Sequence, residues 1–324
     1  MRGGGGPNRC GVSCDASLSA RATLARGFRA YYGSRVARQD AEREAEGRIG
    51  TVLGDKYELL ELIAIGGTGA VFRARHRFTD RPVAVKLLRE DMRANREAVA
   101  RFMREARAAS KLSHPSIAAV LDAGETPDGH PYLVQELLEG RDLFDAIEDG
   151  GLTFEHVIRI GIQLLHGLAA AHDLGIVHRD VKPENVFLVH TRDQSVHVKL
   201  LDFGLAKSFA AGGGASLAIT APGRTVGTPW YMSPEQVAGG TLDARTDVWS
   251  AGAVLFHAAA KEPPFDAPEV LALMTKIVRG RAPRLGEVCP TAPPALLEAV
   301  DRALEPAAKL RWQSAREMAA CLAR

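Results

Sequence analysis

Cysteine is scarce in this chain of 324 residues, and its placement excludes two kinds of covalent framework. The four cysteines are Cys10, Cys14, Cys289 and Cys321. Only Cys10 and Cys14 lie close together, and no second pair matches their spacing, so neither a disulfide scaffold nor a zinc site is indicated. We therefore expect free thiols and a cytoplasmic protein.

Long hydrophobic runs and an excess of charge of one sign are also missing. The longest apolar stretch, residues 248–260, contains Ser250 and His257 and is shorter than the ~20 residues of a membrane span. The net charge is only +2, which says little about partners. We expect no membrane span and no nucleic-acid partner. A chain that is 46% hydrophobic and 25% charged is ordinary for a soluble protein.

The most informative string is residues 178–185, which read His-Arg-Asp-Val-Lys-Pro-Glu-Asn, and Asp202 opens an Asp-Phe-Gly string further on. Asp180 offers a carboxylate to receive a hydroxyl proton, and Lys182 offers an ammonium to meet a phosphate. Asn185 and Asp202 supply the oxygen donors that hold a divalent metal. An ordinary charged loop would explain the first three residues alone, but not all of these groups in register.

A glycine-rich turn precedes this string at residues 63–72. Gly66, Gly67 and Gly69 let backbone N–H groups approach a phosphate without a Cβ in the way. The first glycine of the pattern G-x-G-x-x-G is replaced by Ala64, so the match is incomplete. We expect the hairpin to form and to be stiffer than with glycine. A glycine-rich loop without a ligand is the alternative.

Residues 81–88 are rich in β-branched and apolar side chains, which predicts a strand with Pro82 at its start. Because side chains alternate along a strand, Ala84 and Lys86 share one face and the apolar residues between them share the other. A small residue beside an ammonium suits a site for a flat base and phosphates. A solvated charge at a strand end is the alternative for Lys86, but it does not explain its place soon after the glycine-rich hairpin.

Residues 95–112 have the period of a helix, with apolar side chains at steps of three and four. Glu105 lies at the edge of this apolar stripe, three residues after Phe102. A carboxylate at that place needs a cation, and Lys86 is the candidate. An ion pair with an arginine of the same helix is the alternative for Glu105.

In the order and spacing of these motifs, the chain resembles the eukaryotic-type serine/threonine protein kinases in the form found in bacteria, from about Tyr57 to Leu322. The resemblance implies an α+β, two-lobed protein-kinase fold. Residues 51–135 would form a small β-rich lobe and residues 136–324 a larger, mainly helical lobe. ATP and two Mg²⁺ ions, or Mn²⁺ in their place, would bind between the lobes.

The resemblance also implies a role for each catalytic residue. Asp180 is expected to be the catalytic base and Lys182 to contact the γ-phosphate. Lys86 is expected to bind the α- and β-phosphates while paired with Glu105. The implied metal ligands are Asn185 and Asp202.

Two details resemble kinases for serine and threonine rather than for tyrosine. Lys182 stands two residues after the catalytic aspartate, and Thr228 follows Gly227. The resemblance implies that Thr228 hydrogen bonds to Asp180 and Lys182, and so belongs with the catalytic residues.

Residues 130–140 are expected to form the hinge between the lobes. By resemblance, the backbones of Glu136 and Leu138 bond the edge of adenine, and Gln135 is the gatekeeper. Asp142 is the candidate contact to the ribose, with a solvated acidic residue as the alternative. The other residues expected around the nucleotide are Ile63, Gly66, Gly67, Gly69, Val71, Ala84, Lys86 and Phe187.

Two further motifs resemble structural features of the same family. Glu235 follows Ser233, which stands where many members have alanine, and is expected to pair with Arg311. Asp247 is expected to support the backbone of the catalytic loop. It opens a helix that is apolar nearly all round, and such a helix belongs in the centre of a domain.

The segment between Asp202 and Glu235 is where we expect regulation. Arg179, beside the catalytic base, implies by resemblance an arginine pocket that reads a phosphate on this segment. We expect autophosphorylation at Thr220 or Thr225, in trans through a transient homodimer. The expected substrates are proteins that carry serine or threonine.

The first fifty residues differ from the rest in composition. Through residue 38 they carry seven arginines and one acid, a balance of +6. A basic arm for an anionic surface or nucleic acid, or a transit peptide, would account for this. A disordered tail over residues 1–50, or a start codon assigned too far upstream, is the simpler interpretation and the one we favour. Residues 39–50 are expected to add a short charged helical turn.

The leading functional hypothesis is an active, ATP-dependent protein serine/threonine kinase. A pseudokinase that binds nucleotide or a partner without turnover is the alternative, and among the motifs only Ala64 favours it. A small-molecule phosphotransferase is disfavoured, since such enzymes lack the Ser-Pro-Glu element and the long segment before it.

Overall fold

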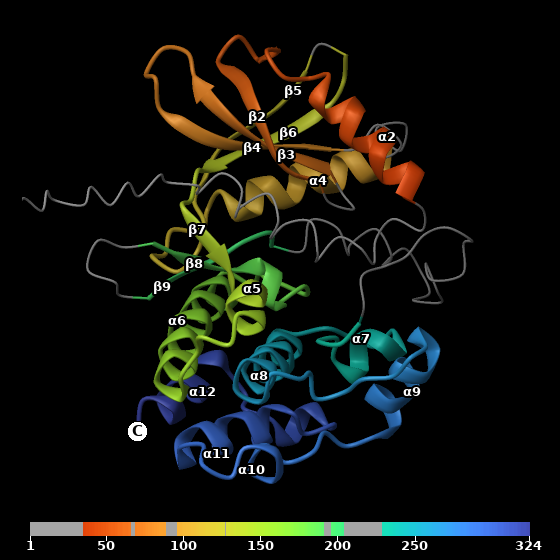
Figure 1. Ribbon diagram of the computed structural model, residues 1–324, viewed down its shortest axis with the longest axis vertical. Coiled ribbons are helices and arrows are strands. Elements are labelled where there is room, and N and C mark those ends of the chain that lie inside the picture. The colour runs from red at the N-terminus through yellow and green to blue at the C-terminus, as the bar shows by residue number, and fades with distance from the viewer. Residues whose placement is uncertain (1–34, 66–68, 89–95, 127, 191–195, 204–228) are drawn as a thin grey trace, which may run out of the picture.

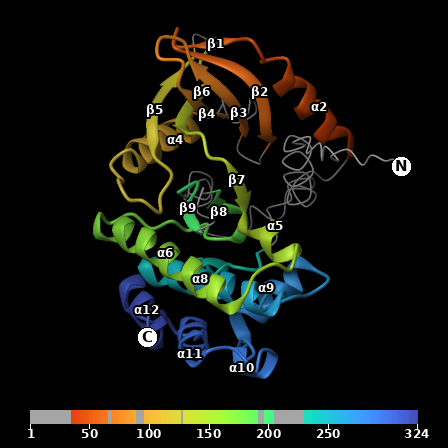
Figure 2. The ribbon, with the colours of Figure 1, turned by 60° about the vertical axis from the view of Figure 1, so that its left-hand side comes forward.

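The protein is built of two lobes (Figure 1). The computed structural model describes residues 35–65, 69–88, 96–126, 128–190, 196–203 and 229–324. A six-stranded sheet forms most of the small lobe, helices form the large lobe, and a three-stranded sheet lies between them (Figures 1 and 2). The α+β, two-lobed prediction is therefore confirmed.

The small lobe is an antiparallel sheet with strand order β1-β2-β3-β4-β6-β5. Its helices and strands are α2 (Arg35–Glu46), β1 (Val52–Leu53), β2 (Tyr57–Ile65), β3 (Gly69–His76), β4 (Pro82–Leu88), α4 (Arg96–Ala109), β5 (Val120–Glu125) and β6 (Pro131–Glu136).

The alternation predicted along β4 divides the small lobe into two layers of packing. Val83, Val85 and Leu87 are nearly fully buried in a cluster with residues of β2 and β3. Leu88 belongs to a second cluster, in which α4 contributes Phe102. The period of two along the strand thus separates the residues that face α4 from those that face away from it.

Helix α2 packs against β2 on the side of the sheet away from α4 (Figure 2). Ala45 is 7% exposed and joins the cluster that contains Leu53 and Tyr57. Just after the helix, Arg48 donates a hydrogen bond to the ring of His130 over 2.9 Å. The sequence predicted only a short turn over residues 39–50, because a buried alanine such as Ala45 gives little periodic signal. Residues 1–34 lie outside the described part of the chain.

The large lobe begins with the three-stranded antiparallel sheet, in the order β7-β8-β9. Its helices and strands are β7 (Gly140–Asp142), α5 (Leu143–Glu148), α6 (Phe154–Asp173), the 3-10 turn η1 (Pro183–Asn185), β8 (Val186–Val189), β9 (His197–Leu200), α7 (Pro234–Ala238), α8 (Ala244–Ala260), α9 (Val270–Arg279), α10 (Leu285–Val288), α11 (Pro294–Ala303), the 3-10 turn η3 (Ala308–Leu310) and α12 (Ala315–Leu322).

Helix α8 lies at the centre of the large lobe, as predicted from its apolar circumference. It packs against α6, α11 and α12, and its residues from Thr246 to Ala258 are all buried. A Cβ at Gly252 would lie 2.6 Å from the Cβ of Ala303, so a glycine lets α8 and α11 approach closely. Of the helices in the described part of the chain, none has the length and apolar character needed to cross a membrane.

Candidate active site

Lys86 of the small lobe and Asp202 of the large lobe meet in a direct ion pair. Lys86 is 7% exposed on β4, and its Nζ lies 2.8 Å from Oδ2 of Asp202. Asp202 follows β9 and has a φ of +50°. A residue other than glycine keeps this left-handed backbone only where its surroundings hold it. The lobes therefore present an amine and a carboxylate to the same place.

Asp247, at the start of α8, holds the backbone of the catalytic loop. Its Oδ2 accepts a hydrogen bond from the backbone N–H of His178 at 2.7 Å, and its Oδ1 accepts one from Arg179 at 2.8 Å. His172 Nε2 lies 2.8 Å from the same carboxylate. Asp247 is fully buried, so these bonds are shielded from water. The predicted support of the loop is confirmed.

His178 connects this loop to the strand end that carries Asp202. Its Nε2 donates to the carbonyl of Leu201 at 2.8 Å, and its Nδ1 accepts from the backbone N–H of Asp180 at 3.2 Å. The ring also packs on Phe203, with 4.7 Å between centroids. Complete burial lowers the pKa of His178. The ring is therefore neutral, as a donor and an acceptor on one imidazole require.

Asp180, Lys182 and Asn185 form a hydrogen-bonded group within the loop. The amide of Asn185 donates to the backbone carbonyl of Asp180 at 2.7 Å and to its Oδ2 at 3.2 Å. Lys182 Nζ lies 3.3 Å from the same Oδ2. Burial alone would lower the pKa of Lys182, but the nearby carboxylates of Asp180 and Glu184 raise it above its ordinary value. The ammonium is therefore charged at every physiological pH.

Asn185 and Asp202 are neighbours through the backbone. The N–H of Leu201 donates to the carbonyl of Asn185 at 2.8 Å, which places η1 directly beside the residue before Asp202. A carboxylate and an amide oxygen are hard donors, and Mg²⁺ is usually held by one or two such groups with phosphate and water completing its shell. The donor set fits Mg²⁺. No cluster of three or more His, Cys, Asp or Glu side chains suited to a metal occurs among the described residues.

The residues expected around the base belong to the two sheets and the hinge. Ala84 is the register partner of Gln135, and Val71 is that of Lys86. Gly69 begins β3, where a Cβ would collide with the carbonyl of Leu87. Five apolar residues expected around the base are only partly buried, whereas the core residues around them are buried. Partial burial is what a surface that contacts a ligand would show. The five are Ile63, Val71, Ala84, Leu138 and Phe187.

Asp142 has a structural role besides its predicted contact with ribose. It is the N-cap of α5, and its Oδ1 accepts a hydrogen bond from the N–H of Asp145 at 2.9 Å. Burial, together with the carboxylates of Asp145 and Glu184, raises its pKa to about 7. Asp142 is also the register partner of Phe187. It therefore lies at the predicted site while stabilising the helix that follows.

The side chain of Glu136 links the hinge to the large lobe, although only its backbone was predicted to matter. Its Oε1 lies 2.7 Å from Nζ of Lys199 on β9 and accepts from the N–H of Ala119 at 2.8 Å. Lys199 also donates to the carbonyl of Ile117 at 3.4 Å. Sequence motifs could not reveal this pair, because a lysine in an apolar strand carries no partner information of its own.

Several predicted residues cannot be placed. Gly66, Gly67 and Thr228 lie outside the described residues, as do Thr220 and Thr225. Glu105 belongs to α4, but its side chain is not among those described. The Lys86–Glu105 pair therefore stays a prediction.

The predicted pair of Glu235 and Arg311 is confirmed. Arg311 is fully buried and donates from Nη1 and Nη2 to the two oxygens of Glu235, at 2.7 and 2.9 Å. It also donates to the carbonyls of Glu305 and Pro306. The pair fastens the Ser-Pro-Glu element to the segment after α11.

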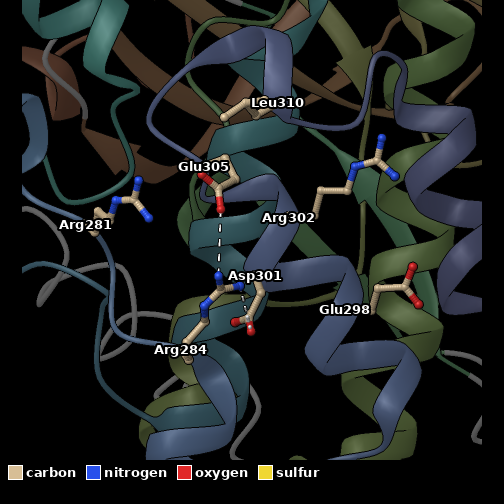
Figure 3. Close-up of a pocket in the computed structure, with 7 residues that line it drawn as sticks. All are labelled: Arg281, Arg284, Glu298, Asp301, Arg302, Glu305 and Leu310. Atoms are coloured by element: carbon tan, nitrogen blue, oxygen red, sulfur yellow. Dashed lines mark hydrogen bonds and ion pairs between the residues drawn. The ribbon is translucent and has the colours of Figure 1, made fainter.

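A pocket of about 480 Å³ lies elsewhere, beside α10 and α11 (Figure 3), at the end of the large lobe farthest from the small lobe (Figure 1). Arg284 lies near Asp301 and Glu305 within it, at 3.4 and 3.9 Å. None of the described site residues lines it, so it is separate from the site around Lys86 and Asp202. Its lining residues are Arg281, Arg284, Glu298, Asp301, Arg302, Glu305 and Leu310.

Comparison with known proteins agrees with this geometry. A family model described as "Protein kinase domain" matches residues 57–317. The serine/threonine-protein kinase PknB of Mycolicibacterium smegmatis is 38% identical over 276 residues, which cover 84% of this chain and 43% of that protein. The serine/threonine-protein kinase pkn3 of Myxococcus xanthus is 39% identical over 229 residues, 70% of this chain and 42% of that one. The chain thus spans about two fifths of the length of these relatives.

Solved structures show the same fold. The kinase domain of PknI from Mycobacterium tuberculosis matches with a TM-score of 0.67 and 28% sequence identity, over 85% of this chain and 96% of that one. The two-lobed arrangement is therefore a known architecture.

Proposed function

The chain belongs to the protein kinase family, and we propose that it is a serine/threonine kinase that transfers the γ-phosphoryl group of Mg-ATP to protein hydroxyls. The observation that supports this most is the ion pair between Lys86 of the small lobe and Asp202 of the large lobe. The hydrogen-bonded group of Asp180, Lys182 and Asn185 lies beside it, because the N–H of Leu201 donates to the carbonyl of Asn185. The names of the similar proteins, which are serine/threonine-protein kinases, agree with it.

In this proposal the chain contributes position and charge more than covalent chemistry. The oxygen of a serine or threonine attacks the γ-phosphorus, the bond to the β–γ bridging oxygen breaks, and ADP leaves. Asp180 accepts the hydroxyl proton, helped by the charge of Lys182 at 3.3 Å. Lys86 holds the α- and β-phosphates.

Asn185 and Asp202 would hold Mg²⁺, or Mn²⁺ in its place, and the metal would neutralise charge on the phosphates. Adenine would lie between Ala84, Val71 and Phe187, with its edge on the backbones of Glu136 and Leu138. The partial burial of the apolar members of this set supports the assignment.

We also propose how the protein is regulated, which hydroxyls it prefers and where it is located. Phosphorylation at Thr220 or Thr225, in trans through a transient homodimer, would activate the protein, with Arg179 in the arginine pocket that reads the phosphate. Thr228 and Lys182 would direct the choice of serine and threonine over tyrosine. We propose a cytoplasmic location, which suits both the use of ATP and the free thiols of Cys289 and Cys321.

The substitution Asp180→Asn tests the function. It removes the proton acceptor while keeping the shape, so we expect transfer of ³²P from ATP to protein to fall to background and binding of Mg-ATP to remain. Asp173→Asn is the matched control, since Asp173 is exposed and pairs only with Arg316 in the described contacts. Transfer at background level by the wild type as well as by Asp180→Asn would favour a pseudokinase. Equal transfer above background by both proteins would refute the role of Asp180 as the base.

A further inference from the structure

Gln236, one residue beyond the Ser-Pro-Glu element, reaches the catalytic loop with its side chain. It lies on α7 and is partly buried. Its Nε2 donates a hydrogen bond to the backbone carbonyl of Arg179 at 2.8 Å. Arg179 immediately precedes Asp180, and the two bonded residues are 57 positions apart in the sequence.

The other end of the same amide is also engaged. Oε1 of Gln236 accepts from the backbone N–H of Ser233 at 3.0 Å, while the hydroxyl of Ser233 accepts from the N–H of Gln236 at 3.3 Å. An amide with a donor on one side and a carbonyl on the other can take only one orientation. The capping box of α7 therefore aims Nε2 at the catalytic loop.

The carbonyl that receives this bond belongs to the peptide unit between Arg179 and Asp180. The N–H of that unit, on Asp180, donates to Nδ1 of His178 at 3.2 Å. On its other side, Arg179 is held through its own N–H by Asp247 at 2.8 Å. Gln236 thus ties this peptide unit to α7.

This peptide unit needs to be held. Arg179 has a φ of +66°, and a residue other than glycine keeps this left-handed backbone only where its surroundings hold it. Asp180 is two bonds beyond the carbonyl, so rotation of the peptide unit would swing its carboxylate away from Lys182 and Asn185. The orientation of the proposed base depends on the same bonds.

We propose that Gln236 is a positioning residue, which fixes the Arg179–Asp180 peptide unit and thereby couples the seating of α7 to the orientation of Asp180. The inference rests on the proposed kinase function for its rate effect. The restraint of the catalytic loop by Gln236 does not depend on whether the protein transfers phosphate.

Two substitutions separate this role from a role in α7 alone. Gln236→Glu is nearly isosteric and keeps an acceptor for the N–H of Ser233, but it offers no proton to the Arg179 carbonyl. Ser233→Ala removes the capping hydroxyl and leaves Nε2 of Gln236 in place. Gln236→Met preserves the length of the side chain and removes its bonds to both Ser233 and Arg179. It replaces Gln236→Glu in the test if the charge of the glutamate prevents folding.

For each variant, kcat and KM for ATP are measured with a peptide substrate, alongside the thermal midpoint and hydrogen exchange of the amides of Arg179 and Asp180. We expect Gln236→Glu or Gln236→Met to lower kcat about tenfold with little change in KM, and to speed exchange of both amides. Ser233→Ala should lower only the thermal midpoint.

Unchanged kcat or unchanged amide exchange in a folded Gln236 variant would overturn the inference, as would the same changes in Ser233→Ala. If the wild-type protein transfers no phosphate, the proposed function fails on that result alone. The exchange of the two amides still decides whether Gln236 restrains the loop.

Discussion

Arg311 donates two hydrogen bonds of 2.7 and 2.9 Å to the carboxylate of Glu235, and its guanidinium is fully buried. Thr246 donates a third bond to the carboxylate at 3.0 Å. The guanidinium carbon also lies 4.8 Å above the ring of Trp249. These contacts join the end of the Ser-Pro-Glu element, the central helix α8 and the segment after α11. Loss of the ion pair would therefore weaken the packing of three parts of the large lobe.

Replacing Arg311 with methionine should destabilise the protein by about 3–5 kcal/mol, because the half-buried carboxylate of Glu235 loses its counter-charge. The measurement is the free energy of unfolding in urea. Arg316→Met is the matched control, since Arg316 is 65% exposed beside Asp173 and such surface pairs contribute about 0–1 kcal/mol. A loss no larger at Arg311 than at Arg316 would contradict this account.

Replacing Lys86 with methionine should lower phosphotransfer about 10²-fold or more, because it removes a preorganised charge from the phosphates. The fold should survive, since Lys86 contacts Asp202 and not the cluster of Val83 and Val85. Circular dichroism and ³²P transfer measure the two effects. Lys111→Met, an exposed substitution in the small lobe, is the control, and equal activity of both variants would rule out the role of Lys86.

Asp142 gives stability an unusual dependence on pH. Its pKa is raised to about 7 in the folded protein, against about 3.9 in an unfolded chain. Between these values the folded state binds more protons, so this group's contribution to stability falls as the pH rises from 4 to 7.

The substitution Asp142→Asn should therefore raise the thermal midpoint at pH 8, since asparagine caps a helix as well as aspartate without a buried charge. The gain should shrink as the pH falls from 8 and disappear near pH 3, below both pKa values, where the wild-type carboxyl is protonated in both states. Thermal scans of both proteins across this range make the comparison. A difference that does not depend on pH would contradict the raised pKa.

His257 acts in the opposite direction. Burial lowers its pKa to about 4, and its Nδ1 accepts a hydrogen bond from the hydroxyl of Tyr231 at 2.7 Å. The unfolded chain takes up a proton first as the pH falls from 6.5 to 4, so this part of the stability is lost in that window.

His257→Gln should remove this loss, because the glutamine carbonyl can accept from Tyr231 and does not titrate. Relative to the unfolding free energy of the wild type, that of the variant should rise by at most about 3 kcal/mol as the pH falls from 6.5 to 4.5. The difference between the two proteins isolates His257 from Asp142, which titrates in the same range. Parallel curves would refute the assignment.

Much of the candidate site could be predicted from the sequence because kinase motifs are short and local. Lys86 was predicted from the alternation of β4, and Asp180, Asn185 and Asp202 from fixed spacings. The central position of α8 followed from its apolar circumference. In each case, neighbouring residues along the chain carry the signal.

The contacts that hold the site together could not be read in this way. Gln236 meets Arg179 over 57 positions, and Lys199 meets Glu136 over 63. Asp142 was predicted as a ribose contact, yet its cap on α5 appears only when the backbone of β7 turns into the helix. These contacts join residues that are far apart in the sequence, and no local sequence pattern predicts which distant parts of the chain meet.

By itself the sequence determined the family, the two-lobed fold and the identity of the charged groups, since periodicity and motif spacing act over a few residues. Tertiary structure alone decided which groups face one another: the direct contact of Lys86 with Asp202 across 116 positions, and the raised pKa of Asp142. Packing sets distance and burial, and these control the strength of an ion pair and the charge of a carboxyl group.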